Sequence, residues 1–155
     1  MKQDKSTDES FKEGLKIISR KPRTRLEVET RLLGKEYSEE CVNQTLEKMT
    51  EEKLIDDEAY VREWFQVVAK RRGYGFWLIL KKLGRKGLPN ELIEQIYQEE
   101  YRDLEKSILA REAQKKMCQF ELRNADEQKK KTKLGLFLSS RGFSEELIRE
   151  FLDQL

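Results

Sequence analysis

Apolar residues recur along this chain at helical spacing, and they form a similar set three times. Each set has an aliphatic residue, a leucine four residues later, and an apolar residue five residues after that, which we call the anchor. A spacing of four residues places side chains on one face of an α-helix, so each set predicts a helix followed by a turn. Such a repeat indicates tandem structural units. The sets are Val28, Leu32 and Tyr37; Ile79, Leu83 and Leu88; and Leu134, Leu138 and Phe143.

The residues around each anchor predict how one helix ends and the next begins. A Gly or Glu comes before each anchor, and a residue in the left-handed conformation commonly ends a helix. Ser38, Pro89 and Ser144 follow the anchors, as an N-cap or as a proline in the first helical turn. Glutamates come next, where the positive end of the helix dipole favours them. Each unit therefore contains a helix, a turn at the anchor, and a second helix.

A further helix is expected ahead of each pair, over residues 11–19, 57–72 and about 102–123. Thr24 and Glu27 have the spacing of a capping box at the start of the next helix in the first unit. In the second unit, Gly73-Tyr74-Gly75 provides the break between the helices. The predicted fold is therefore all-α, with three tandem three-helix repeats that form an elongated, curved array. The expected parts are a flexible N-terminus over residues 1–10 and repeats over 11–55, 56–101 and 102–155.

Composition changes this picture mainly by what it excludes. Charged residues make up 40% of the chain and hydrophobic residues 37%, a balance that suits thin apolar layers in small units better than one thick core. The chain has no histidine and no glycine-rich phosphate loop, so we expect no enzyme, no catalytic residue, no cofactor and no metal. Its apolar runs are too short to span a bilayer, and residues 1–10 do not resemble a signal peptide. We therefore expect a cytoplasmic protein.

Charge is segregated along the chain, although the net charge is only +2. The basic clusters at residues 20–25 and 70–72 each lie between the first and second helices of a unit, beside a helix N-terminus, which is a natural anion site. They either contact DNA phosphates or an acidic protein surface, or they form a solvated face. Tyr74 either stacks on a base or seals the turn.

The helix that follows Gly75 has an aromatic residue outside its predicted core face. Its core face holds Phe76, Ile79, Leu80 and Leu83, and Leu78 lies on the opposite side with Trp77 at its flank. Aromatic and basic residues are enriched in binding hot spots, so Trp77 either contacts a partner or packs against the neighbouring unit. The candidate partner-binding or nucleic-acid-binding residues are Arg20, Lys21, Arg23, Arg25, Lys70, Arg71, Arg72, Tyr74, Trp77, Lys81, Lys82, Arg85 and Lys86.

Three strings add a family resemblance. They are Lys21-Pro22-Arg23-Thr24, then Leu54-Ile55-Asp56-Asp57-Glu58 followed by Tyr60, and Gly73-Tyr74-Gly75 together with the string from Leu83 to Leu88. With the repeat, they resemble the bacterial regulatory protein RecX family, strongly from about Lys21 to Tyr97 and traceably to Leu155. The string Phe76-Trp77-Leu78 departs from the family, which often has basic or polar residues there.

The resemblance implies a non-enzymatic regulator of the RecA recombinase in DNA repair, recombination and the SOS response. Proteins of this family lie along the RecA–DNA filament and typically inhibit its ATPase, strand exchange and growth. The implied partners are the RecA filament and, weakly or through the filament, single- or double-stranded DNA. No membrane is implied, and a monomer is expected.

A second hypothesis is a stand-alone helical nucleic-acid-binding protein, because a helix–turn–helix pair also reads DNA. The third helices, however, begin with acidic residues such as Glu39, Glu91 and Glu145, which phosphates repel. That charge pattern disfavours insertion of these helices into a DNA groove.

Overall fold

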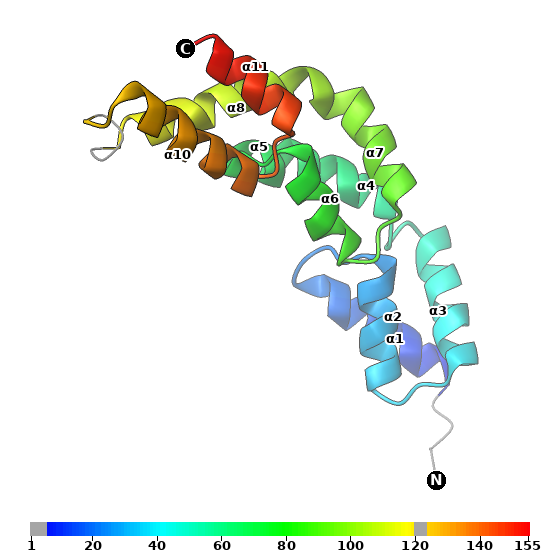
Figure 1. Cartoon of the computed structure of the whole chain (residues 1–155). Coiled ribbons are helices and arrows are strands. Elements are labelled where there is room, and N and C mark those ends of the chain that lie inside the picture. Colours follow the sequence, from blue (N-terminus) through cyan, green and yellow to red (C-terminus); the bar gives the residue numbers. More distant parts are fainter. Residues whose placement is uncertain (1–5, 120–123) are drawn as a thin grey trace. The chain divides into compact units, whose positions relative to one another are not determined.

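The computed structural model describes residues 6–119 and 124–155, and every regular element in these ranges is a helix (Figure 1). The all-α prediction is therefore confirmed for the described part of the chain. The chain divides into two compact units, one of residues 1–61 with 84–89 and one of residues 62–83 with 90–155. The helices are α1 (Thr7–Ser19), α2 (Arg25–Gly34), α3 (Glu39–Glu51), α4 (Asp57–Glu63), α5 (Lys70–Arg72), α6 (Phe76–Gly84), α7 (Asn90–Ile96), α8 (Arg102–Met117), α10 (Glu127–Ser140) and α11 (Glu145–Asp153).

In the first unit, α1, α2 and α3 surround one apolar core. Gly14 lets α1 approach α3 closely, because a Cβ atom there would stand 2.7 Å from the Sδ atom of Met49. The capping box predicted at the start of α2 is present, with Thr24 as the N-cap and Glu27 as its partner. The buried core residues are Val28, Leu32, Val42, Leu46, Met49 and Ile55, with Phe11, Ile17, Ile18, Tyr37 and Leu54 packed against them.

Helix α1 begins earlier than the sequence pattern indicated. Residues 7–10 were expected in a flexible N-terminus, but they form the first turn of α1. The side chain of Ser6 caps this turn by accepting a hydrogen bond from the backbone N–H of Glu9 at 3.2 Å. Ser10 is fully buried, and its hydroxyl accepts a hydrogen bond from the Thr45 hydroxyl at 2.8 Å. Residues 1–5 lie outside the described residues.

Two segments of π-helix interrupt the longest helices. The segment η1 (Trp64–Ala69) joins α4 to α5, and η2 (Tyr97–Tyr101) joins α7 to α8, so the chain is helical without a break over 57–72 and over 90–117. The repeat boundary expected between residues 101 and 102 is thus inside a continuous helix. Phe65 in η1 and Tyr101 in η2 are both fully buried, with ring centroids 5.1 Å apart.

Helix α8 ends at Met117, short of the predicted end near residue 123. Residues 118–119 are not helical, and residues 120–123 lie outside the described part of the chain. Helices α10 and α11 follow and pack with α8 in the second unit (Figure 1).

The three anchors occupy equivalent turns, as the repeat pattern predicted. The residue before each anchor has a positive φ, namely 69° at Glu36, 83° at Gly87 and 94° at Gly142. In the first and third turns, the N–H groups of Tyr37 and Phe143 donate to carbonyl oxygens five residues earlier, at 3.4 and 3.3 Å, which is the bond that closes a Schellman turn. All six residues at the two positions upstream are fully buried: Val28, Leu32, Ile79, Leu83, Leu134 and Leu138.

Candidate partner-binding and nucleic-acid-binding site

The N-termini of α2 and α6 are occupied by carboxylates of the protein itself. Asp57 accepts a hydrogen bond from the backbone N–H of Arg25 at 2.9 Å, and Glu105 accepts one from Phe76 at 3.0 Å. The N–H of Trp77 donates to the carbonyl oxygen of Gly142 at 3.0 Å. The expectation of an anion site at these helix ends is therefore wrong, because internal acceptors already fill it. Any contact of the basic clusters with a phosphate must come from their side chains.

Other segments of the second unit approach the backbone of Gly73-Tyr74-Gly75 closely. Gly73 has φ of +70° and lies against the carboxylate of Glu112, so a side chain at residue 73 would overlap it. Gly75 lies against the backbone of Gly142 and Phe143, and its N–H donates to the carbonyl oxygen of Arg141 at 2.8 Å. Both glycines are thus required by close approach of other chain segments.

Tyr74 lies in this turn with its ring in contact with other side chains. It stacks on Trp64 with a centroid distance of 5.9 Å, and Lys82 and Arg141 each lie 5.3 Å from its ring centroid. Its carbonyl oxygen accepts a hydrogen bond from the Tyr101 hydroxyl at 2.6 Å. Of the two interpretations of Tyr74, these contacts support the one in which it seals the turn.

The basic cluster of Lys70, Arg71 and Arg72 is held at its backbone by arginines from distant segments. Arg111 donates to the carbonyl oxygen of Lys70, and Arg141 donates to that of Arg72. The side chains of Arg71 and Arg72 are left exposed. Arg111 and Arg141 thus hold the end of the helix over 57–72, while the side chains of Arg71 and Arg72 stay in solvent.

A buried carboxylate organises these arginines. Glu112, with only 7% of its side chain exposed, lies 3.1 Å from Arg111, 3.6 Å from Lys115 and 3.8 Å from Arg141. The sequence analysis did not identify Glu112 or Arg141. The Arg141 side chain donates to the carbonyl oxygen of Arg72, 69 residues away along the chain, and no local spacing connects these two residues.

In the first unit, Arg23 and Lys86 surround Glu27. The guanidinium of Arg23 lies 3.1 Å from the Glu27 carboxylate and the Lys86 ammonium 3.8 Å from it. Burial raises the pKa of Glu27, but the hydrogen bonds from Arg23 and from the Thr24 N–H, with the nearby charge of Lys86, outweigh burial and leave the pKa below its ordinary value. The Thr24 hydroxyl also donates to the carbonyl oxygen of Lys86 at 2.7 Å. Part of the predicted basic surface is therefore neutralised internally.

The other predicted basic residues of the first unit divide between an open hollow and the surface. Arg20 and Arg23 line a hollow between α1 and α2 together with three basic residues that the sequence analysis did not select, Lys16, Arg31 and Lys35. Arg25 is half-buried and its guanidinium donates to the Thr50 hydroxyl at 3.2 Å. Lys21 and Arg85 are exposed outside this lining.

Helix α6 exposes Trp77, which is 58% accessible to solvent. Lys81 is exposed one turn further along the same helix. Leu78, which was expected on the outer side, is half-buried because its Cβ atom lies against Gly142 in the turn between α10 and α11. Of the residues assigned to the core, Ile79 and Leu83 are fully buried and Phe76 and Leu80 half-buried. The exposure of Trp77 favours partner contact over packing inside the chain.

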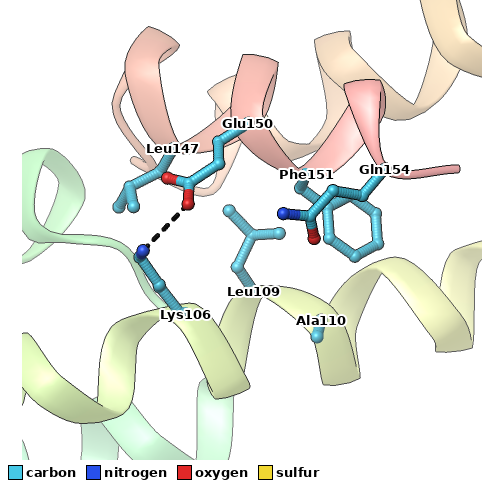
Figure 2. A pocket seen from close by; sticks show the side chains of 7 residues that line it. All are labelled: Lys106, Leu109, Ala110, Leu147, Glu150, Phe151 and Gln154. Atoms are coloured by element: carbon cyan, nitrogen blue, oxygen red, sulfur yellow. Dashed lines mark hydrogen bonds and ion pairs between the residues drawn. The ribbon is translucent and has the colours of Figure 1, made fainter.

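A small apolar hollow lies between α8 and α11 in the second unit. Figure 2 shows Leu109, Leu147 and Phe151 at its walls, with Lys106 and Glu150 joined at 3.0 Å on its rim. Its volume is about 200 Å³. Most of the lining is apolar, and its two charged side chains, Lys106 and Glu150, pair with each other.

Residues 6–119 and 124–155 contain no group of three or more side chains arranged to hold a metal ion. Within the same ranges, no helix has both the length and the apolar character needed to cross a membrane.

Comparison with known proteins gives consistent matches over nearly the whole chain. The chain is 31% identical to the regulatory protein RecX of Chlorobium limicola, over 98% of this chain and 92% of that protein. It is 27% identical to the regulatory protein RecX of Chlorobium phaeobacteroides, over 98% of this chain and 97% of that protein. Residues 12–49 also match the family description "RecX, first three-helix domain". The chain belongs to the RecX family.

Solved structures support the same assignment at the level of the fold. The crystal structure of RecX from Lactobacillus salivarius superposes with a TM-score of 0.86, at 22% sequence identity, over 96% of this chain and 97% of that one. The RecX relatives are named as regulatory proteins and not as enzymes, which supports the prediction of a non-enzymatic role.

Proposed function

We propose that this RecX-family chain regulates the RecA recombinase by binding along the RecA–DNA filament. In this proposal it inhibits ATP hydrolysis, strand exchange and filament growth during DNA repair and recombination. The observation that carries the proposal is the similarity to regulatory proteins named RecX over 98% of the chain. The repeated helical units are proposed to present similar patches to successive subunits of the polymer. The protein is proposed to act as a cytoplasmic monomer.

The exposed side of α6 is the proposed contact with the filament. Trp77 and Lys81 are four residues apart and both exposed, so they are neighbours on the helix surface. The tryptophan offers a large apolar area and is a residue enriched in binding hot spots, and the lysine beside it adds a positive charge. Leu78 of the same helix packs against Gly142, so binding would have to order side chains but not the backbone of α6.

The direct test is the ATPase activity of RecA on single-stranded DNA, measured with increasing amounts of this protein. The proposal predicts a fall in the rate of ATP hydrolysis and shorter filaments in the same samples. An unchanged rate at a molar ratio well above one protein per recombinase would contradict it. A RecX-family protein of established activity serves as the positive control.

The second candidate is a stand-alone nucleic-acid-binding protein, and the basic hollow between α1 and α2 favours it. The two candidates differ in whether the recombinase is needed. A protein that binds oligonucleotides but leaves the recombinase ATPase unchanged would have the second function.

A further inference from the structure

Among the residues that the structure describes, five basic side chains and one acidic side chain line the hollow between α1 and α2. The basic residues are Lys16, Arg20, Arg23, Arg31 and Lys35, and the acidic residue is Glu13. Lys16 and Arg20 are four residues apart along the chain, as are Arg31 and Lys35 on the α2 side. Residues with this spacing stack on one side of a helix, about 6 Å apart along its axis. Two pairs of cations therefore line the same hollow from its two sides.

Most of this positive charge is not neutralised by the protein. Glu13 pairs with Lys35, and Arg23 pairs with Glu27. Within the part of the chain that the structure describes, the side chains of Lys16, Arg20 and Arg31 form no ion pair. The Nε atom of Arg23 is buried and has no hydrogen-bond partner among the described residues. Like charges gathered in one hollow repel one another, so an anion bound between them relieves this repulsion.

We propose that this hollow is a binding site for the phosphate groups of a nucleic-acid strand. Arginine presents its N–H groups as a fork that matches the oxygens of a phosphate, and three of the five cations are arginines. A strand carries one charge per nucleotide, so several cations of the open hollow can be contacted at once. None of the described residues that line the hollow is aromatic, so bases have no stacking platform among them and binding is expected to be independent of sequence. This site requires no recombinase.

The test is the binding of labelled single-stranded oligothymidylate to the full chain over a range of salt concentrations, with no recombinase present. The variant Arg20→Gln/Arg31→Gln removes two unpaired charges from the hollow. Each lost phosphate contact on a single strand lowers the dependence of log K on log salt by about 0.7, so the slope is expected to fall by about 1.4. Affinity at low salt is expected to fall by about tenfold.

The matched control is Lys12→Gln/Lys53→Gln, which removes the same net charge from exposed positions of the same unit outside the hollow. It is expected to change the slope by much less than the hollow variant, and circular dichroism of both variants checks the fold. Equal losses in the two variants, or no binding of the oligonucleotide by the native chain, would overturn the proposal. The proposal would also be overturned if polyglutamate competed for the site as strongly as an oligonucleotide of equal charge. The hollow would then be a site for an acidic protein segment. None of these readouts depends on whether the chain acts on the recombinase.

Discussion

The backbone of Gly73 lies against the carboxylate of Glu112, which is nearly buried and contacted by Arg111, Lys115 and Arg141. The string Gly73-Tyr74-Gly75, one of the three that carry the family resemblance, is thereby tied to α8 and to the turn after α10. Its two glycines serve this packing. The proposed contact surface begins beyond the string, at the exposed side chain of Trp77.

Replacement of Gly73 by alanine is expected to destabilise the protein by about 3 kcal/mol. A left-handed conformation costs a residue with a Cβ atom about 1–2 kcal/mol, and overlap with the fixed Glu112 side chain adds to this. Chemical denaturation followed by circular dichroism measures the change. Gly84→Ala is the control, because a Cβ atom there meets nothing within 4 Å and the residue is helical, so its free energy of unfolding should stay within about 1 kcal/mol of the native value. Equal losses in the two variants would contradict the packing argument.

Glu112→Gln should lower the free energy of unfolding by about 2 kcal/mol. The substitution keeps the shape but removes the charge that offsets Arg111, Lys115 and Arg141, and the cations left near a partly buried amide repel one another. Glu127→Gln is the control, since the Glu127 side chain is 81% exposed and its contact with Lys130 at 3.8 Å is weak. We expect that control to stay within about 0.5 kcal/mol of the native protein.

The repeat predicts opposite outcomes for two leucines on α10. Leu138→Ala removes a fully buried side chain at the position shared by all three repeats, and should cost about 3 kcal/mol. Leu136 lies two residues earlier and is 69% exposed, so Leu136→Ala should change stability by less than about 0.5 kcal/mol. Thermal unfolding of the two variants side by side provides the comparison. Similar unfolding temperatures would show that the third repeat does not pack as described.

The depressed pKa of Glu27 predicts a pH dependence of stability. Because the folded pKa lies below the ordinary value of 4.5, Glu27 stabilises the folded state above about pH 4.5, and this contribution is lost as the pH falls through the lower folded pKa. The difference in free energy of unfolding between the native chain and Glu27→Gln should be constant near neutral pH and should shrink in acid. A difference that grows as the pH falls would have the wrong sign.

Trp77→Ala is expected to weaken binding to the RecA filament while leaving the fold intact. The side chain is 58% exposed, so its loss should change the free energy of unfolding by less than about 1 kcal/mol. Truncation of an aromatic hot spot commonly costs about 2 kcal/mol of binding free energy, or roughly a thirtyfold weaker affinity. Filament co-sedimentation measures the affinity. Val67→Ala, at an exposed apolar residue outside α6, is the control and should bind like the native chain.

Much of the fold could be predicted from the spacing of apolar residues that are close together in the sequence. The spacing of Val28 and Leu32, repeated at Ile79 and Leu83, identified the buried face of each middle helix, because a helix of fixed period converts sequence spacing directly into a face. The positive φ at Glu36, Gly87 and Gly142 also followed from the residues around the anchors. These features depend only on residues a few positions apart.

The site depended on contacts that no local pattern contains. Whether Leu78 faced solvent was decided by Gly142, and whether the N-termini of α2 and α6 were open to anions was decided by Asp57 and Glu105. Phe65 and Tyr101, each in a π segment that the sequence pattern did not predict, likewise meet across 36 residues of sequence. The sequence alone determined the middle helix of each repeat, the turn at its anchor and its buried face, since neighbouring residues set backbone geometry. Only the tertiary structure decided which charges are neutralised and which are left for a partner, because ion pairs form between residues that folding brings together.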